Sequence, residues 1–83
     1  MAKPGYHLKP IKKGVCGELS KVKEEIEEHE DALAQDCKIM AVLELADLYG
    51  ALELYAKKFG VTMDDLRKMS DITHRAWENG ARK

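Results

Sequence analysis

Residues 37–59 form the most hydrophobic stretch of the chain. Apolar side chains fall on every side of a 3.6-residue spiral there, which predicts a helix that is buried nearly all round. Glu44 and Asp47 interrupt the pattern three residues apart, so they share one face of that helix. An ionised carboxylate that leaves water without compensation is costly. The pair therefore predicts positive charge close by, and a metal ion is the simplest candidate.

Residues 17–34 carry an apolar stripe on one side only. Its members recur at spacings of three and four, which predicts an amphipathic helix that packs against another helix. The stripe consists of Leu19, Val22, Ile26, His29 and Leu33. We interpret His29 as a packed residue of this stripe rather than as a metal ligand.

Acids crowd the same predicted helix, with six of them among residues 24–31. Like charges three or four residues apart repel each other, and neighbouring lysines offset only part of this repulsion. Three of the acids project far from the stripe and are expected to be solvated: Glu24, Glu27 and Asp31. Glu25 and Glu28 instead flank the stripe, one turn apart, and are expected at the interface with the next helix.

The connection at residues 34–38 is too short for a crossover, which predicts an antiparallel hairpin of the two helices. Glu28 lies about six residues before this loop, and Glu44 lies about six residues after it. The hairpin should therefore bring the pair Glu25 and Glu28 level with the pair Glu44 and Asp47.

The ends of the chain differ in character. Residues 1–16 contain both prolines and several lysines, which predicts an extended basic arm. This arm is either a solvated tail or a segment that lies across a partner subunit or an anionic ligand. Near the other end, Gly60 should end the second helix, and Thr62 with the acids after it should begin a third helix over residues 62–79.

Composition agrees with a small all-α protein. The 83 residues suffice for one domain, and a chain that devotes a wholly apolar helix to its centre should bury part of it against other copies. We therefore expect an antiparallel hairpin plus a third helix, assembled into an oligomeric core of the four-helix-bundle type. A homodimer or a homotetramer would satisfy this expectation.

Net charge and cysteine spacing exclude several classes of ligand and indicate where the protein is located. A net charge of -1 gives no bulk attraction to nucleic acid or to an anionic membrane. Cys16 and Cys37 fit no metal-binding or redox spacing, so we interpret them as free thiols. Acids break the longest apolar run before it reaches the length of a membrane span, and no apolar leader is evident. These features predict a cytoplasmic location.

Two acid pairs on facing helices offer a set of hard oxygen ligands. Such a set suits Mg²⁺, or Mn²⁺, better than zinc. Mg²⁺ in proteins is commonly shared between carboxylates and the phosphates of a substrate, which favours a nucleotide as the ligand.

The order of the acids resembles a known signature. Glu24-Glu25-Ile26-Glu27-Glu28, followed after fifteen residues by Glu44-Leu45-Ala46-Asp47, is similar to the EExxE and ExxD motifs of the MazG-like, all-α nucleoside triphosphate pyrophosphohydrolases. The resemblance covers residues 17–59, and the small size is similar to that of compact phage-encoded members. It implies an oligomeric helical enzyme that splits the α-β phosphoanhydride of a nucleotide and releases a monophosphate and pyrophosphate.

The resemblance also implies roles for residues. By position, Glu25, Glu28, Glu44 and Asp47 would hold Mg²⁺. Glu24 would be a further ligand or would orient the attacking water, and we place Glu24 and Glu25 in the catalytic set. The candidates for contacting the nucleotide phosphates are Lys12, Lys13, Lys68, Arg75 and Asn79, each of which is equally an ordinary surface residue.

A different class of function stays open. The acids are then merely a polar face of a helical interaction module, which binds a partner protein through its apolar helix without turnover. In that case Lys or Arg from across an oligomer interface would neutralise Glu44 and Asp47. A third alternative, a degenerate member that binds nucleotide and metal without turnover, is disfavoured because the full set of four acids is present.

Overall fold

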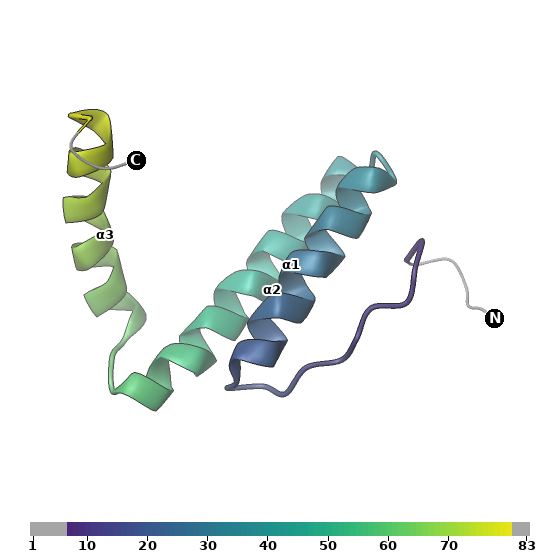
Figure 1. The fold of residues 1–83 in the computed structure, drawn as a ribbon, viewed down its shortest axis with the longest axis horizontal. Coiled ribbons are helices and arrows are strands. Elements are labelled where there is room, and N and C mark those ends of the chain that lie inside the picture. The colour runs from purple at the N-terminus through teal and green to yellow at the C-terminus, as the bar shows by residue number, and fades with distance from the viewer. Residues whose placement is uncertain (1–6, 81–83) are drawn as a thin grey trace.

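A computed structural model describes residues 7–80, and they form an all-α structure (Figure 1). The elements are α1 (Leu19–Ala34), α2 (Lys38–Ala56), the 3-10 turn η1 (Lys57–Phe59) and α3 (Met63–Glu78). Helices α1 and α2 pack side by side as an antiparallel hairpin, while α3 stands apart at the far end of α2. The predicted all-α class with three helices and a hairpin is thus confirmed.

Short local interactions set the ends of the hairpin. At the closed end, Asp36 adopts a positive φ of 56°, and the amide of Cys37 donates to the carbonyl oxygen of Ala32 at 3.1 Å. This tight turn reverses the chain within the short connection. At the open end, Lys58 Nζ lies 3.0 Å from Glu18 Oε1, so an ion pair joins the start of α1 to η1.

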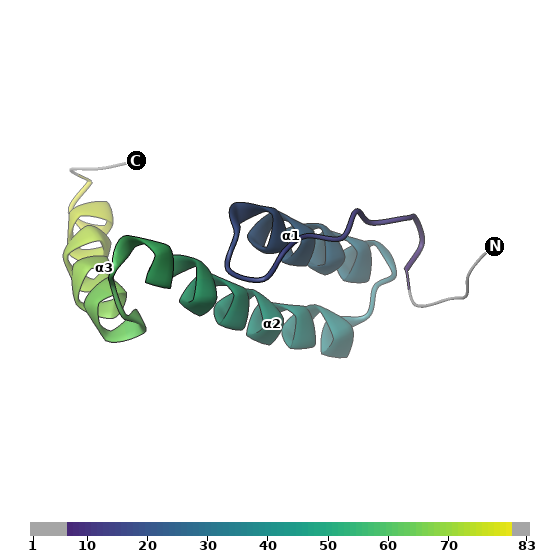
Figure 2. The same cartoon turned by 90° about the horizontal axis from the view of Figure 1, so that it is seen from below.

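An arm formed by residues 7–16 runs beside α1 in the opposite direction (Figures 1 and 2). The amide of Gly14 donates to Glu24, near the start of α1, and the amide of Leu8 donates to Asp31, almost two turns further along. The arm therefore lies across its own helix. The first six residues of the predicted basic arm lie outside the described residues.

This arrangement corrects the expected packing of α1. Glu24 and Asp31 were expected on a solvated face, yet each is only 3% exposed because the arm covers them. The apolar stripe is instead largely exposed: of its large aliphatic members Val22 is buried, whereas Leu19, Ile26 and Leu33 are at least two-fifths exposed. Within the single chain, α1 thus turns its acids inward and much of its stripe outward.

The core of the hairpin is correspondingly small. Its buried apolar residues are Val22, Ala32, Ala41, Ala51 and Ala56. The single large side chain that is fully buried among the described residues is that of Glu44. Helix α2, expected to be buried nearly all round, is buried on one side only and leaves most of its large apolar residues exposed.

Helix α3 begins with the predicted cap. The amide of Asp65 donates to Thr62 Oγ1 at 3.1 Å, and the amide of Thr62 donates to Asp65 Oδ2 at 2.9 Å. These bonds form a capping box and lower the pKa of Asp65. Gly60, with a φ of 73°, supplies the left-handed residue that ends η1 and redirects the chain. Among the described residues, no helix is both long enough and apolar enough to cross a membrane.

Candidate metal centre

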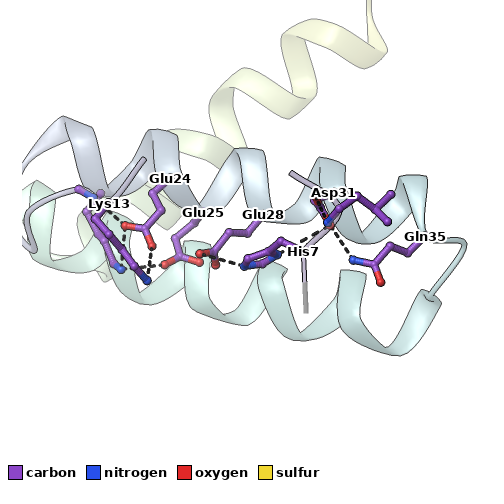
Figure 3. A network of polar contacts seen from close by, with 10 residues as sticks. His7, Lys13, Glu24, Glu25, Glu28, Asp31 and Gln35 are labelled. Atoms are coloured by element: carbon purple, nitrogen blue, oxygen red, sulfur yellow. Dashed lines mark hydrogen bonds and ion pairs between the residues drawn. The ribbon is translucent and has the colours of Figure 1, made fainter. Parts of the chain in front are cut away.

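Carboxylates line the contact between α1 and α2. Glu24 and Glu25 are neighbours on α1, Glu28 follows about one turn later, and all three project toward α2, as Figure 3 shows. Glu44 and Asp47 come from the middle of α2 and meet them there. The hairpin thus brings the four predicted metal ligands and Glu24 to the same contact, but neither group of candidate ligands contains all four.

The carboxylates form two groups with a common member. One oxygen each of Glu24, Glu25 and Glu28 lie within 4.8 Å of one another, and so do one oxygen each of Glu25, Glu44 and Asp47. Because Glu25 belongs to both groups, the five acids form one continuous cluster, which we call the acid cluster. Its members differ in exposure: Glu44 is completely buried, whereas Asp47 is exposed. The cluster is therefore buried at its centre and open at the Asp47 end.

Glu28 has a pKa well above that of an ordinary carboxyl group. Its burial, the side-chain hydrogen bonds with Glu44 and Glu24, and the negative charge of Glu25 raise its pKa to about 8. A protonated Glu28 is the hydrogen-bond donor that lets neighbouring carboxylates lie together without full repulsion. In the absence of a metal ion, this proton supplies part of the compensating positive charge.

Glu24 has the opposite electrostatics. Burial alone would raise the pKa of Glu24. The Gly14 amide donates to Oε1 at 2.8 Å, and Lys21 Nζ lies 3.1 Å from the same oxygen. Together these partners outweigh the effect of burial and lower the pKa of Glu24. Lys21 also lies 3.2 Å from Glu25, and the bonds to both acids raise the pKa of its ammonium group. Glu24 is therefore an ionised carboxylate at any pH near neutrality.

The arm supplies further partners beyond the cluster. Both oxygens of Asp31 accept from the Leu8 amide, at 3.1 and 2.9 Å, and Gln35 donates to Asp31 Oδ1 at 2.6 Å. Although burial acts to raise the pKa of Asp31, these bonds lower it. His7 lies between two acids, 3.7 Å from Glu28 and 3.7 Å from Asp31 (Figure 3). Asp31 thus anchors the arm, and it stays outside both groups of candidate ligands.

The cluster fits a divalent cation by its donor chemistry. All its donors are carboxylate oxygens, the ligands that Mg²⁺ and Mn²⁺ prefer. Glu25 Oε1 is buried and accepts no hydrogen bond from any of residues 7–80. A buried carboxylate oxygen without a donor is unfavourable, and coordination to a cation would relieve this cost. Glu25 is also the residue that the two groups share.

The predicted phosphate contacts fall in two places. Lys12 and Lys13 lie in the arm, and with Lys23 and Ser20 they line a cavity of about 240 Å³ beside Glu24. Lys13 Nζ is 3.8 Å from Glu24 Oε2. The other candidates, Lys68, Arg75 and Asn79, belong to or directly follow α3, which lies beyond the end of the hairpin (Figure 2). In the single chain, the structure does not gather them around the acid cluster.

Several residues at or beside the cluster were not among the predicted site residues. Lys21 and His7 pair with its acids, and Asp31 anchors the arm that covers it. For Lys21 a signal existed, because it lies three and four residues before Glu24 and Glu25. For His7 the sequence gives none, since the contact depends on the path of the arm. His29 packs toward α2, with Nδ1 2.9 Å from the Ala41 carbonyl oxygen, and lies outside both groups of candidate ligands.

Fold and site together define a small all-α protein of three helices, in which buried acid groups on a hairpin could hold a metal ion. Neither models of known protein families, nor curated proteins, nor solved structures match this chain. The similarity to MazG-like enzymes thus rests on the spacing of the acids.

Proposed function

We propose that this protein is a Mg²⁺-dependent nucleoside triphosphate pyrophosphohydrolase, which cleaves the α-β phosphoanhydride and releases nucleoside monophosphate and pyrophosphate. The observation that carries the proposal is the meeting of five carboxylates from facing helices in one cluster. Lys21, the Gly14 amide and the raised pKa of Glu28 compensate part of this like charge, but Glu25 Oε1 is buried and accepts no hydrogen bond from the described residues. A divalent cation would compensate the rest and would also attract a polyanionic substrate.

In this proposal Glu25, Glu28, Glu44 and Asp47 hold the Mg²⁺ ion, or Mn²⁺ in its place. A bound divalent cation would neutralise phosphate oxygens and lower the pKa of a coordinated water. Glu24 suits the orientation of the attacking water, because the lowered pKa keeps this carboxylate ionised and able to accept a hydrogen bond. Glu25 belongs to both groups of candidate ligands, and we place it with Glu24 in the catalytic set.

The lysines beside Glu24 suit the triphosphate. Lys12, Lys13 and Lys23 line one cavity beside Glu24, and the positive charge gathered there would attract phosphate oxygens to the cluster. Lys68, Arg75 and Asn79 would contribute only if α3 of a second copy approached the cluster. A homodimer or homotetramer is the form in which this approach is open to them, and the reaction at the acid cluster does not require it.

Product analysis tests the reaction. The purified protein is incubated with a panel of ribo- and deoxyribonucleoside triphosphates in the presence of Mg²⁺, Mn²⁺ or EDTA, and the products are separated. We expect monophosphate and pyrophosphate with metal only. Glu44→Gln should lose turnover by about 100-fold or more, because it removes a ligand charge at the buried centre. Glu53→Gln, an exposed acid on the same helix, is the matched control and should keep wild-type turnover.

A second candidate function is a non-catalytic interaction module with an acidic face. The large exposed apolar residues of α2 and α3 favour it, because such surface binds protein partners. The two functions separate in the same experiment. If no triphosphate yields product at high protein concentration, whereas the protein remains helical, the pyrophosphohydrolase is wrong and the interaction module stands.

A further inference from the structure

The single chain exposes more surface than its mass requires. Its accessible surface is 6238 Å², whereas a compact monomer of 9.4 kDa exposes about 5,000 Å². Its radius of gyration is 15.3 Å, against about 12 Å for a compact chain of this length. The difference in area, about 1,200 Å², exceeds the roughly 800 Å² that one partner contributes to a standard protein interface.

Apolar residues of α2 supply part of this surplus. Hydrophobic residues occur all around α2, but α1 covers only one side of it. Ile39 is 83% exposed, and five further aliphatic or aromatic residues of the helix are more than two-fifths exposed: Val42, Leu43, Leu45, Tyr49 and Leu54. A helix of this composition is stable only when its other sides are covered as well.

Helix α3 adds further exposed apolar surface. None of its residues is buried, and Met69, Ile72 and Trp77 are more than half exposed along one stripe. Charged residues on its polar side form ion pairs within the helix: Asp64 pairs with Arg67 at 2.7 Å and with Lys68 at 3.3 Å. An isolated helix of 16 residues is only marginally stable in water, so the stripe requires a packing surface.

In the described part of the single chain, the outer apolar side of α2 is not covered by another element, and the apolar stripe of α3 is not packed against one. The turn at η1 and Gly60 directs α3 away from the hairpin, so α3 does not lie on its own α2 (Figures 1 and 2). Residues Tyr49, Leu52, Met63 and Leu66 line an open cavity of about 500 Å³ at the corner between the helices. A net charge of -1 presents no repulsion between copies.

We infer that a second copy of this chain fills both needs, with α3 of each copy packed on the exposed apolar side of α2 of the other. A two-fold arrangement satisfies both deficits with one kind of contact, because each copy supplies the element that the other lacks. The inference does not depend on the proposed reaction, since it uses none of the carboxylates of the acid cluster.

Self-association is measured on the full chain by sedimentation or light scattering. We expect twice the monomer mass. Ile72→Glu should raise the dissociation constant about 100-fold or more, because it places a charge in an apolar contact. Asp71→Lys, on the opposite side of α3, is the matched control and should leave the constant nearly unchanged. Helix content by circular dichroism checks folding, and Ile72→Ala, with a smaller increase, provides a second variant.

Cross-linking tests the exchange of α3. In a chain with Cys16→Ser and Cys37→Ser, one isotopically labelled population carries Met69→Cys and an unlabelled one carries Leu45→Cys. The populations are unfolded, mixed and refolded, and a short bis-maleimide should then join labelled to unlabelled chains. A monomer at all concentrations overturns the inference, and so does a dimer without these mixed cross-links. Cross-links confined to one chain in the double variant Met69→Cys, Leu45→Cys would instead show α3 folded back on its own hairpin.

Discussion

The proton on Glu28 gives the sharpest prediction about the metal-free protein. In the unfolded chain this carboxyl has an ordinary pKa of 4.5, whereas its burial between Glu44 and Glu24 raises the pKa to about 8 in the folded chain. Between these values the folded chain binds more protons than the unfolded chain. The free energy of unfolding must therefore decrease as pH rises through this range.

The size of the effect follows from the two pKa values. One pKa unit corresponds to about 1.4 kcal/mol, so the stability that the Glu28 proton contributes falls by roughly 3 to 4 kcal/mol between pH 5 and pH 8. Solvent at the open end of the cluster reduces this figure, which is an upper limit. Glu24 and Asp31 act with the opposite sign, because their pKa values are lowered. Their contribution is lost only as the pH falls below about 4.5, outside this window.

Glu28→Gln isolates the effect. The glutamine amide keeps a hydrogen-bond donor for the neighbouring carboxylates but cannot titrate. Unfolding by urea in EDTA, from pH 5 to pH 8, should show a steep loss of stability in the wild type and a much flatter profile in Glu28→Gln. Glu30→Gln, an exposed acid on the same helix, should keep the wild-type slope. A wild-type stability that is flat or increasing over this range, or an unchanged slope in Glu28→Gln, would refute the assignment of the proton.

Two further predictions concern the cation and the arm. Binding of Mn²⁺ at pH 7 should release close to one proton per site, because the ion displaces the proton of Glu28. Calorimetry in buffers of different ionisation enthalpy measures the number of protons released. Binding without proton release would contradict this prediction. Gly14→Ala should destabilise the fold by about 1.5 to 3 kcal/mol, since a Cβ there collides with the Ser20 carbonyl and forces the arm to release Glu24. Gly50→Ala, in open space on α2, should instead stabilise it by about 0.5 to 1 kcal/mol, and equal thermal shifts for both variants would disprove the arm contact.

The sequence predicted those features that depend on neighbouring residues. The short loop after Ala34 is enough to specify a hairpin, and Thr62 with Asp65 is enough to specify a cap. Once the hairpin is known, the helical rise per residue places the pair Glu25 and Glu28 opposite the pair Glu44 and Asp47. These features were accessible because each rests on spacings within a few turns of one helix or across one short loop.

Contacts between distant segments were not accessible in this way. Periodicity placed Glu24 and Asp31 on a solvated face, but backbone amides of the arm bind and bury them. Nothing in the pattern of residues 7–16 specifies the path of an extended segment, because its amides carry no sequence signal. The exposed stripe of α1 shows a second limit. Hydrophobic periodicity identifies a side that requires burial, but not whether the cover comes from the same chain.

The cation and the second copy would answer separate deficits of the single chain. The acid cluster lies at the contact between α1 and α2, where charge repulsion is the unfavourable term, and apolar contacts elsewhere do not reduce it. The exposed apolar surface lies on the outer side of α2 and on α3, and among the described residues neither group of candidate ligands includes a residue of α3. Added metal should therefore stabilise Ile72→Glu as much as the wild type when both are compared as monomers. A metal response that required the dimer would mean that the second copy completes the site, for which Lys68, Arg75 and Asn79 are the residues to test.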